Sequence, residues 1–183
     1  MTDREELFVE NIVKLVGAAL IIISGTLLGW IFSFFYTNRV KELENLKTAF
    51  IFLKNEINLN HTRLSRSLML AGGKVKKPIS ILFLKAAEKL NGDPGREFKE
   101  IWNNVLESLQ NSTNLLEEDF EILLEWGSEV ESTSLEGQLN IHQATINKLE
   151  INLENARDIA DKKVKLSRYT GTLLSLLIII LFY

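Results

Sequence analysis

Apolar and polar positions divide the chain into two apolar ends and a polar middle. Residues 15–36 form a run of 22 residues without a charged side chain, LVGAALIIISGTLLGWIFSFFY. As a helix this run is about 33 Å long, enough to cross a bilayer core of about 30 Å. It therefore predicts a membrane-spanning helix, in which Trp30, Phe34, Phe35 and Tyr36 form an interfacial aromatic belt.

A second apolar run, YTGTLLSLLIIILFY, covers residues 169–183 and has 15 residues. Its helical length of about 22 Å is short for a full span. It is nevertheless very apolar, and the basic stretch before it, which includes Lys162, Lys163, Lys165 and Arg168, can extend its long side chains to the interface. We predict a second membrane helix here. The alternative is a terminal hydrophobic helix that packs into the soluble domain.

Other interpretations of the first run stay open. A cleaved signal peptide fits poorly, because the residues before the run are net acidic and the run exceeds a usual signal core. Gly25 and Gly29 form a GxxxG pair, a spacing that lets two membrane helices approach closely. This pair is a candidate for transmembrane packing and for a homo-oligomeric pore, although glycine is common in membrane helices without any specific dimer.

Basic residues predict the orientation in the membrane. Arg39, Lys41 and Lys47 follow the first run, and the basic stretch at residues 157–168 precedes the second. Because cytoplasmic flanks carry the excess of Lys and Arg, the middle domain is expected in the cytoplasm and both termini outside. The predicted organisation is a tail at residues 1–11, a membrane helix at 12–36, a cytoplasmic domain at 37–168 and a membrane helix at 169–183.

The middle domain shows helical periodicity throughout. Its first stripe alternates spacings of three and four, and the pattern predicts one helix from Val40 to a stop at residues 71–73. The stripe consists of Leu43, Leu46, Phe50, Leu53, Ile57, Asn60, Leu64 and Ser67.

Four further helices are expected. One begins at Pro78 and ends at the turn of residues 91–95, one covers residues 98–109, and one begins near Leu115. The last has a heptad-like seam from Leu135 and no helix breaker before the second apolar run, which predicts one continuous helix from about Ser134. The predicted fold is thus all-α: a bundle of about five helices flanked by an N-terminal and a short C-terminal transmembrane helix.

Composition and motifs give no sign of catalysis. The 183 residues carry a net charge of −3, no basic stripe and no cysteine, so we expect no nucleic-acid binding and no thiolate or cysteine-based zinc chemistry. No phosphate-binding glycine loop and no HExxH motif occurs. His142 falls on the heptad seam, where a hydrogen-bonded polar residue can fix helix register, and His61 is expected to be exposed. We expect a non-enzymatic protein without a catalytic, cofactor or metal site.

Two charged clusters are candidates for partner docking, although each also fits an ordinary solvated surface. The first is Lys74, Lys76 and Lys77, in the turn after the first helix. The second is the acidic fourth helix, with Glu117, Glu118, Glu121 and Glu125. Acids in its first turn also suit the helix dipole.

Several blocks, in this order and spacing, give the chain a resemblance to the stage III sporulation protein AB family. They are KLVGAALIIISGTLLGW at residues 14–30, GREFKEIWNNVLESL at 95–109, LLEEDFEILLEWG at 115–127, and a Gln-containing start to the last helix at Gln138. The chain departs from the family pattern after Gly127, where a second glycine is absent.

The resemblance implies a role. Such proteins belong to an assembly in the mother-cell membrane that faces the forespore and are thought to contribute to a channel-like secretion complex. Their soluble region is similar to the platform domain of type II secretion and type IV pilus inner-membrane proteins. The implied partners are a cytoplasmic secretion-type ATPase and the other components of the membrane complex. The alternative is a membrane-anchored helical receptor with a ligand pocket inside the bundle.

Overall fold

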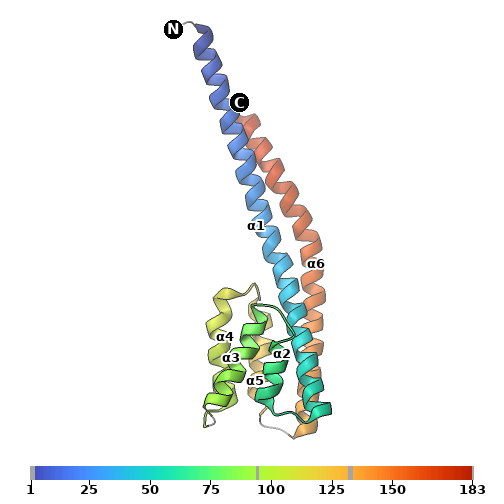
Figure 1. Ribbon diagram of the computed structural model, residues 1–183. Coiled ribbons are helices and arrows are strands. Elements are labelled where there is room, and N and C mark those ends of the chain that lie inside the picture. The colour runs from blue at the N-terminus through green and yellow to red at the C-terminus, as the bar shows by residue number, and fades with distance from the viewer. Residues whose placement is uncertain (1–2, 94, 132–133, 183) are drawn as a thin grey trace. The chain divides into compact units, whose positions relative to one another are not determined.

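The computed structural model describes residues 3–93, 95–131 and 134–182, and every regular element in these ranges is helical. The prediction of an all-α bundle is confirmed. The α-helices are α1 (Asp3–Asn60), α2 (Leu64–Gly72), α3 (Ile79–Gly92), α4 (Phe98–Leu109), α5 (Glu117–Glu129) and α6 (Leu135–Phe182), with a short 3-10 helix, η1 (Gln110–Ser112), after α4 (Figure 1). The single helix predicted from about Ser134 through the second apolar run is confirmed as α6.

The chain divides into two compact units, and both long helices contribute to each. Unit 1 consists of Met1–Thr37 and Asp158–Tyr183, and unit 2 of Asn38–Arg157. In unit 1 the N-terminal part of α1 and the C-terminal part of α6 lie side by side (Figure 1).

Unit 1 carries one candidate membrane span among the residues that the structure describes. Its helix, from Ala19, contains an 18-residue window with a mean hydropathy of 1.9, of which 13% is buried. A core helix of a soluble protein would bury most of such a window, so this exposure indicates membrane association. Large apolar side chains are exposed at Leu20, Ile23, Leu27, Trp30, Ile31 and Phe34.

The small residues of this span lie on a different face. Gly29 and Ser33 are buried and Gly25 is half-buried within the single chain. Residues four apart share one face of a helix, so these three form a stripe along α1 that the chain itself covers. The exposed bulky residues are left for lipid.

In unit 2 the prediction of one helix from Val40 to a stop at residues 71–73 is wrong beyond Asn60. Instead of continuing to residue 71, α1 ends at Asn60, and His61 takes a left-handed backbone conformation with φ of 48°. Asn and His tolerate this region better than most residues, and residues 58–63 are polar apart from Leu59. The break lets the chain turn and start α2, in which Leu68 and Ala71 are fully buried. His61 itself is exposed, as predicted.

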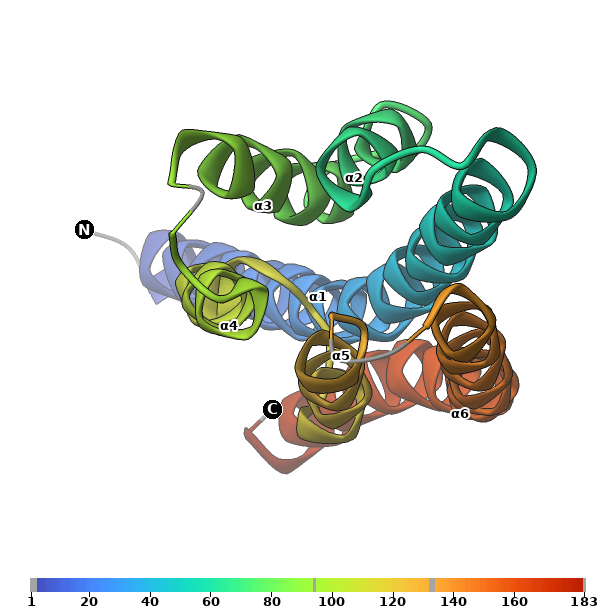
Figure 2. The ribbon, with the colours of Figure 1, turned by 90° about the horizontal axis from the view of Figure 1, so that it is seen from below.

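The short helices α2 to α5 pack in sequence beside the segments of α1 and α6 that belong to unit 2 (Figure 2). Their shared interior is aromatic. Phe50, Phe83, Trp102 and Trp126 come from four different helices and are each at most 1% exposed. Neighbouring rings meet edge to face, with centroids 5.6 Å apart for Phe50 and Phe83 and 4.6 Å apart for the two tryptophans. This is the preferred geometry for aromatic pairs.

Gly127 makes the close approach of α4 and α5 possible. The Trp102 indole lies against its Cα and donates from Nε1 to the Leu123 carbonyl at 2.7 Å. A Cβ on Gly127 would fall 2.9 Å from Trp102 Cγ and closer still to Cδ1. The indole cannot move away without losing its hydrogen bond, so only glycine fits here.

We predict that Gly127→Ala destabilises the protein. Forcing the Trp102 ring from its place costs about 1–3 kcal/mol, which outweighs the gain of about 1 kcal/mol from a better helix former. The free energy of unfolding, followed by tryptophan fluorescence in detergent micelles, measures the effect. The control is Gly92→Ala, where an added Cβ meets nothing within 4 Å. Equal free energies of unfolding for the two variants would contradict the prediction, because they would show that the close contact between Trp102 and Gly127 does not affect stability.

Candidate functional site

A buried ion pair lies at the start of unit 2, three residues after the first apolar run. The Arg39 side chain is 4% exposed and the Asp119 side chain is fully buried. Arg39 Nε donates to Asp119 Oδ2 at 2.9 Å and Nη2 donates to Oδ1 at 3.1 Å. This two-point contact is the strongest geometry of an Arg–carboxylate pair. It joins α1 to the first turn of α5.

The Asp119 carboxylate accepts two further hydrogen bonds. The backbone N–H of Leu116 donates to Oδ2 at 2.9 Å, and Asn152 Nδ2 donates to Oδ1 at 2.8 Å. Asn152 belongs to α6, so one carboxylate links α1, α5 and α6. We call Arg39, Asp119, Asn152 and Glu118 the Arg39 network.

Glu118 completes the network, because Arg39 Nη2 donates to Glu118 Oε1 at 2.5 Å. Burial alone would lower the pKa of Arg39, but the hydrogen bonds and charges of Asp119 and Glu118 outweigh it and raise that pKa above its ordinary value. Arg39 is therefore a permanent buried cation held by two carboxylates.

A second buried carboxylate on α1 holds the segment between η1 and α5. Glu42 is 5% exposed and accepts from Asn114 twice, from the backbone N–H at Oε2 and from Nδ2 at Oε1, each at 2.7 Å. Burial raises the pKa of Glu42, the two Asn114 hydrogen bonds oppose this, and the nearby Asp119 charge adds to it. Together with Asp119, Glu42 fixes both sides of the entry to α5.

His142 lies inside the bundle against the aromatic core. It is fully buried, and its Nδ1 accepts from Trp126 Nε1 at 2.9 Å. The prediction of a hydrogen-bonded seam residue is confirmed. Because Nδ1 accepts, the proton of the neutral ring sits on Nε2, which is buried and has no partner among the described residues. Burial, with a smaller effect of the Lys54 charge, lowers the pKa of His142 from 6.5 to about 4.

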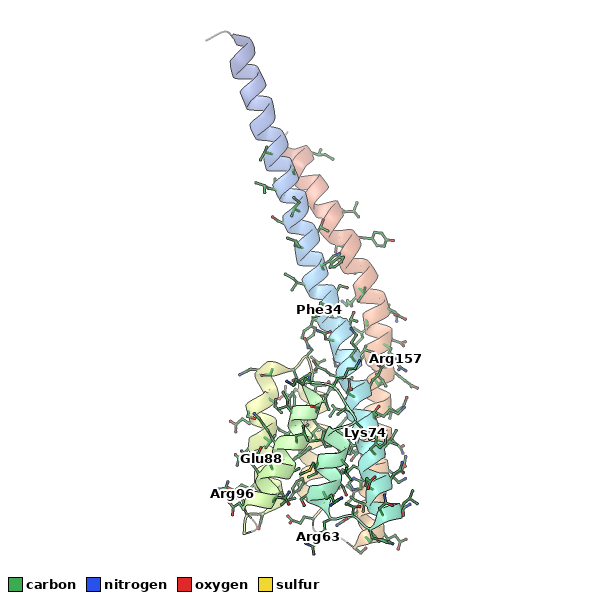
Figure 3. The ribbon with its side chains drawn as sticks, viewed as in Figure 1. Phe34, Arg63, Lys74, Glu88, Arg96 and Arg157 are labelled. Carbon is green, nitrogen blue, oxygen red and sulfur yellow. The ribbon has the colours of Figure 1, made fainter. Side chains whose placement is uncertain are left out.

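The basic docking candidates lie in the turn between α2 and α3. Lys74, Lys76 and Lys77 are all exposed. Lys74 Nζ is 5.8 Å from the centroid of the Phe52 ring on α1, a cation–π contact (Figure 3 labels Lys74). The backbone N–H of Lys76 donates to Asn45 Oδ1 at 3.0 Å. The turn is thus tied to α1, while all three of its lysines remain exposed.

The acidic docking candidates on α5 fall into two groups. Glu118 pairs with Arg39, and Glu125 accepts from Lys148 of α6 at 2.5 Å. Glu117 and Glu121 are exposed, and neither has a cationic partner in the ranges that the structure describes. Two of the four carboxylates already serve contacts inside the bundle, and two remain open to a partner.

Ion pairs also link the two long helices within unit 2. Lys47 pairs with Glu150, and Arg157 Nη2 donates to Glu44 Oε1 at 2.6 Å. Both pairs remain accessible to solvent, the first of them half-buried, so each contributes little stability, but they agree with the register that the buried contacts set.

No group of three or more His, Cys, Asp or Glu side chains suited to a metal ion occurs among the described residues. The charged side chains there either form ion pairs between helices or lie on exposed faces. The ion pairs can hold helices together, and the exposed faces can bind charged partners.

Sequence reasoning missed the roles of five residues: Arg39, Glu42, Asn114, Asp119 and Asn152. From the sequence, Arg39 serves only as an orientation signal, and the acids in the first turn of α5, among which Asp119 falls, are interpreted only as suiting the helix dipole. A signal was nevertheless present. Arg39 stands four residues before Leu43, in phase with the apolar stripe, and Asp119 stands four before the buried Leu123. A charge in phase with a buried stripe requires a buried partner.

We predict that His142 makes unfolding pH-dependent in the acid range. Its folded pKa lies below its unfolded value, so the unfolded state takes up the proton first. The contribution of the neutral ring to stability is complete above pH 6.5 and is lost as pH falls towards 4, and the loss amounts to about 2–3 kcal/mol at pH 4.5. The free energy of unfolding of the full chain in detergent should therefore fall more between pH 7.5 and 4.5 for the wild type than for His142→Gln, which keeps an acceptor for Trp126. Parallel pH curves would contradict the assignment.

Comparison with known proteins places this architecture in a family. The model of the stage III sporulation protein AB family matches residues 14–183. The chain is 26% identical over 169 residues to stage III sporulation protein AB of Bacillus subtilis (strain 168), covering 92% of this chain and 98% of that relative. A solved structure of a stage III sporulation protein AB shares the fold with a TM-score of 0.62 at 20% identity, over 67% of this chain and 96% of the solved one. The chain belongs to the stage III sporulation protein AB family and is a sporulation protein.

Proposed function

We propose that the protein is a non-enzymatic platform in a sporulation secretion-like channel between mother cell and forespore. In this role it docks a cytoplasmic secretion-type ATPase and other components of the same membrane complex. The family gives the link to sporulation. The observation that carries the platform role is the Arg39–Asp119 pair, which couples the helix that bears the apolar span to the acidic helix α5.

The proposed topology places both apolar ends in the mother-cell membrane facing the forespore, unit 2 in the cytoplasm and both termini outside. The candidate span in α1 supports the first anchor. The basic residues that flank the two runs support the orientation, because the side of the membrane with the excess of Lys and Arg is the cytoplasmic side.

The mechanism we propose is mechanical. Two anchors fix the height of the bundle, and the buried network prevents α5 from moving independently of α1. A force applied by the ATPase to the outer face of α5 would then reach the membrane helices through Asp119 and Arg39. The chain itself would change no covalent bond.

The alternative, a receptor with a ligand pocket inside the bundle, has less support. The interior of unit 2 is filled by the aromatic rings of Phe50, Phe83, Trp102 and Trp126. The described hollows lie at the surface instead, between neighbouring helices.

We predict direct, salt-dependent binding between the full chain in non-ionic detergent and a sporulation secretion-type ATPase from the same organism. Exposed charges attract a partner through a field that salt screens, so the affinity should fall about tenfold between low and moderately high salt. Calorimetry in a salt series measures this. Complete absence of binding by the full chain would contradict the proposed docking, and salt-independent binding would exclude the charged faces.

The basic turn can be tested in the same assay. Replacing Lys74, Lys76 and Lys77 together by Glu should weaken binding if the turn contacts the ATPase, because three attractive charges become repulsive. The matched control is Lys85→Glu with Lys89→Glu and Lys99→Glu, which makes the same charge change at exposed positions on α3 and α4. Equal effects of the two triples would point to net charge alone.

A further inference from the structure

A small groove lies on the surface of unit 2 between α4 and α5. Its volume is about 230 Å³, the scale of one long side chain, and it is open to solvent. Its lining comes from Asn103, Leu106 and Glu107 of α4, from Gln110 at the start of η1, and from Phe120 and Leu124 of α5. The three α4 residues follow the spacing 3-1, so they lie on one face of that helix.

The walls of the groove are apolar. Leu106 and Phe120 are buried at its base, while Leu124 is 41% exposed at its edge. An aliphatic chain placed between them would be covered on both sides, and burying such a chain is favourable at roughly 25 cal/mol per Å². The groove is therefore shaped for a side chain with an extended hydrocarbon part.

One of the residues that line the groove, Asn103, has an unused hydrogen-bond acceptor in its side chain. Asn103 Oδ1 is buried and has no hydrogen-bond partner in the described part of the chain. An acceptor left unpaired in this way costs about 1–3 kcal/mol. This oxygen has almost no exposed surface, so a ligand N–H group reaches it only when the half-buried Asn103 side chain rotates towards the groove, and the hydrogen bond then removes that cost.

One carboxylate lines the groove, and helical spacing places two more next to its lining residues on α5. Glu107 lines the groove from α4. On α5, Glu117 and Glu121 each stand three residues before a lining residue, Phe120 and Leu124 respectively, and residues three apart are neighbours on a helix surface. All three carboxylates are exposed and lack a cationic partner among the described residues. The paired carboxylates of α5, Glu118 and Glu125, point instead to Arg39 and Lys148.

The larger hollow between α3 and α4 differs in its charge. It has a volume of about 590 Å³ and is lined by Lys85, Lys89 and Arg96 as well as by Glu88 and Asp93 (Figure 3 labels Glu88 and Arg96). Arg96 already approaches Asp93 at 3.7 Å. Because its charges have both signs and partly pair with each other, this hollow favours neither a cationic nor an anionic ligand. It therefore indicates no particular partner.

We propose that the groove between α4 and α5 binds a Lys or Arg side chain presented by a basic amphipathic segment of a partner protein. The hydrocarbon stem lies between Leu106, Phe120 and Leu124. The charged head donates to Asn103 Oδ1 and pairs with Glu107, while Glu117 and Glu121 take further basic residues of the same segment. The proposal rests on the proposed function only in assigning that segment to the ATPase.

A short helical peptide of Ala, Leu and Arg, labelled with a fluorophore, tests the groove without the ATPase. It is titrated with the full chain in non-ionic detergent and followed by fluorescence anisotropy. We expect it to bind the wild type, and a matched peptide with Gln in place of Arg to bind at least about tenfold more weakly. Equal binding of the two peptides would overturn the proposal.

Variants locate the binding. Glu107→Lys with Glu121→Lys should weaken peptide binding about tenfold or more, whereas the control pair Glu88→Lys with Glu136→Lys, which makes the same change in net charge, should not. Asn103→Asp should tighten binding and Asn103→Leu should weaken it, because the first strengthens the acceptor and the second removes it. Circular dichroism of each variant excludes misfolding. An equal effect of the two charge pairs, or no response to Asn103, would overturn the proposal.

The ATPase assay with the same variants separates this inference from the proposed function. ATPase binding that is insensitive to the groove variants, with no peptide binding, would refute the groove and leave the platform role intact. Groove-dependent peptide binding without any ATPase binding would support the groove and refute the ATPase as its occupant.

Discussion

The Arg39 guanidinium is buried three residues beyond an apolar run, and the rest of unit 2 is arranged around it. A buried charge without a partner costs several kcal/mol, so the fold must bring a carboxylate to this point. Asp119 is that carboxylate, and its four hydrogen bonds reach α1, α6 and its own helix entry. Once Asp119 is placed, the direction of α5 is fixed.

The position of α5 then determines the interior. Trp126 reaches His142 and Trp102 packs against Gly127, so the aromatic cluster closes only if α5 enters in the right register. Apolar burial supplies most of the stabilisation, but it is not directional. The Arg39–Asp119 pair and the Glu42–Asn114 contact supply direction at the same end of α5.

Sequence patterns predicted much of this fold because periodicity reports which face of a helix is buried. The stripe from Leu43 to Ile57 is buried as predicted, and so is the seam of α6 from His142 to Ala160, whereas Leu135, the predicted start of that seam, is 46% exposed. The break after Asn60 was missed because Leu64 and Ser67 continue the same spacing on the next helix, so the period passes through the turn unchanged. The left-handed backbone conformation of His61 marks the break, and the spacing of apolar residues carries no information about φ.

The candidate site was less predictable, because pairing across 80 positions depends on tertiary structure. The acidic face of α5 was apparent as a cluster, yet the sequence could not separate Glu118 and Glu125, which serve internal pairs, from Glu117 and Glu121, which do not. Nor could it place Asn103 beside Phe120 in one groove. Family membership supplied the biological setting, and the geometry supplied the chemistry of docking.

The most direct test of this account is a double-mutant cycle on Arg39 and Asp119, measured as the free energy of unfolding of the full chain in detergent micelles. Arg39→Met and Asp119→Leu should each cost about 3 kcal/mol, because each removes the two-point partner of a buried charge and leaves that charge with weaker contacts only. The double variant should lose less than the sum, with a coupling energy above about 2 kcal/mol. Additive losses would contradict the account, since they would mean that the pair does not hold α5 to α1.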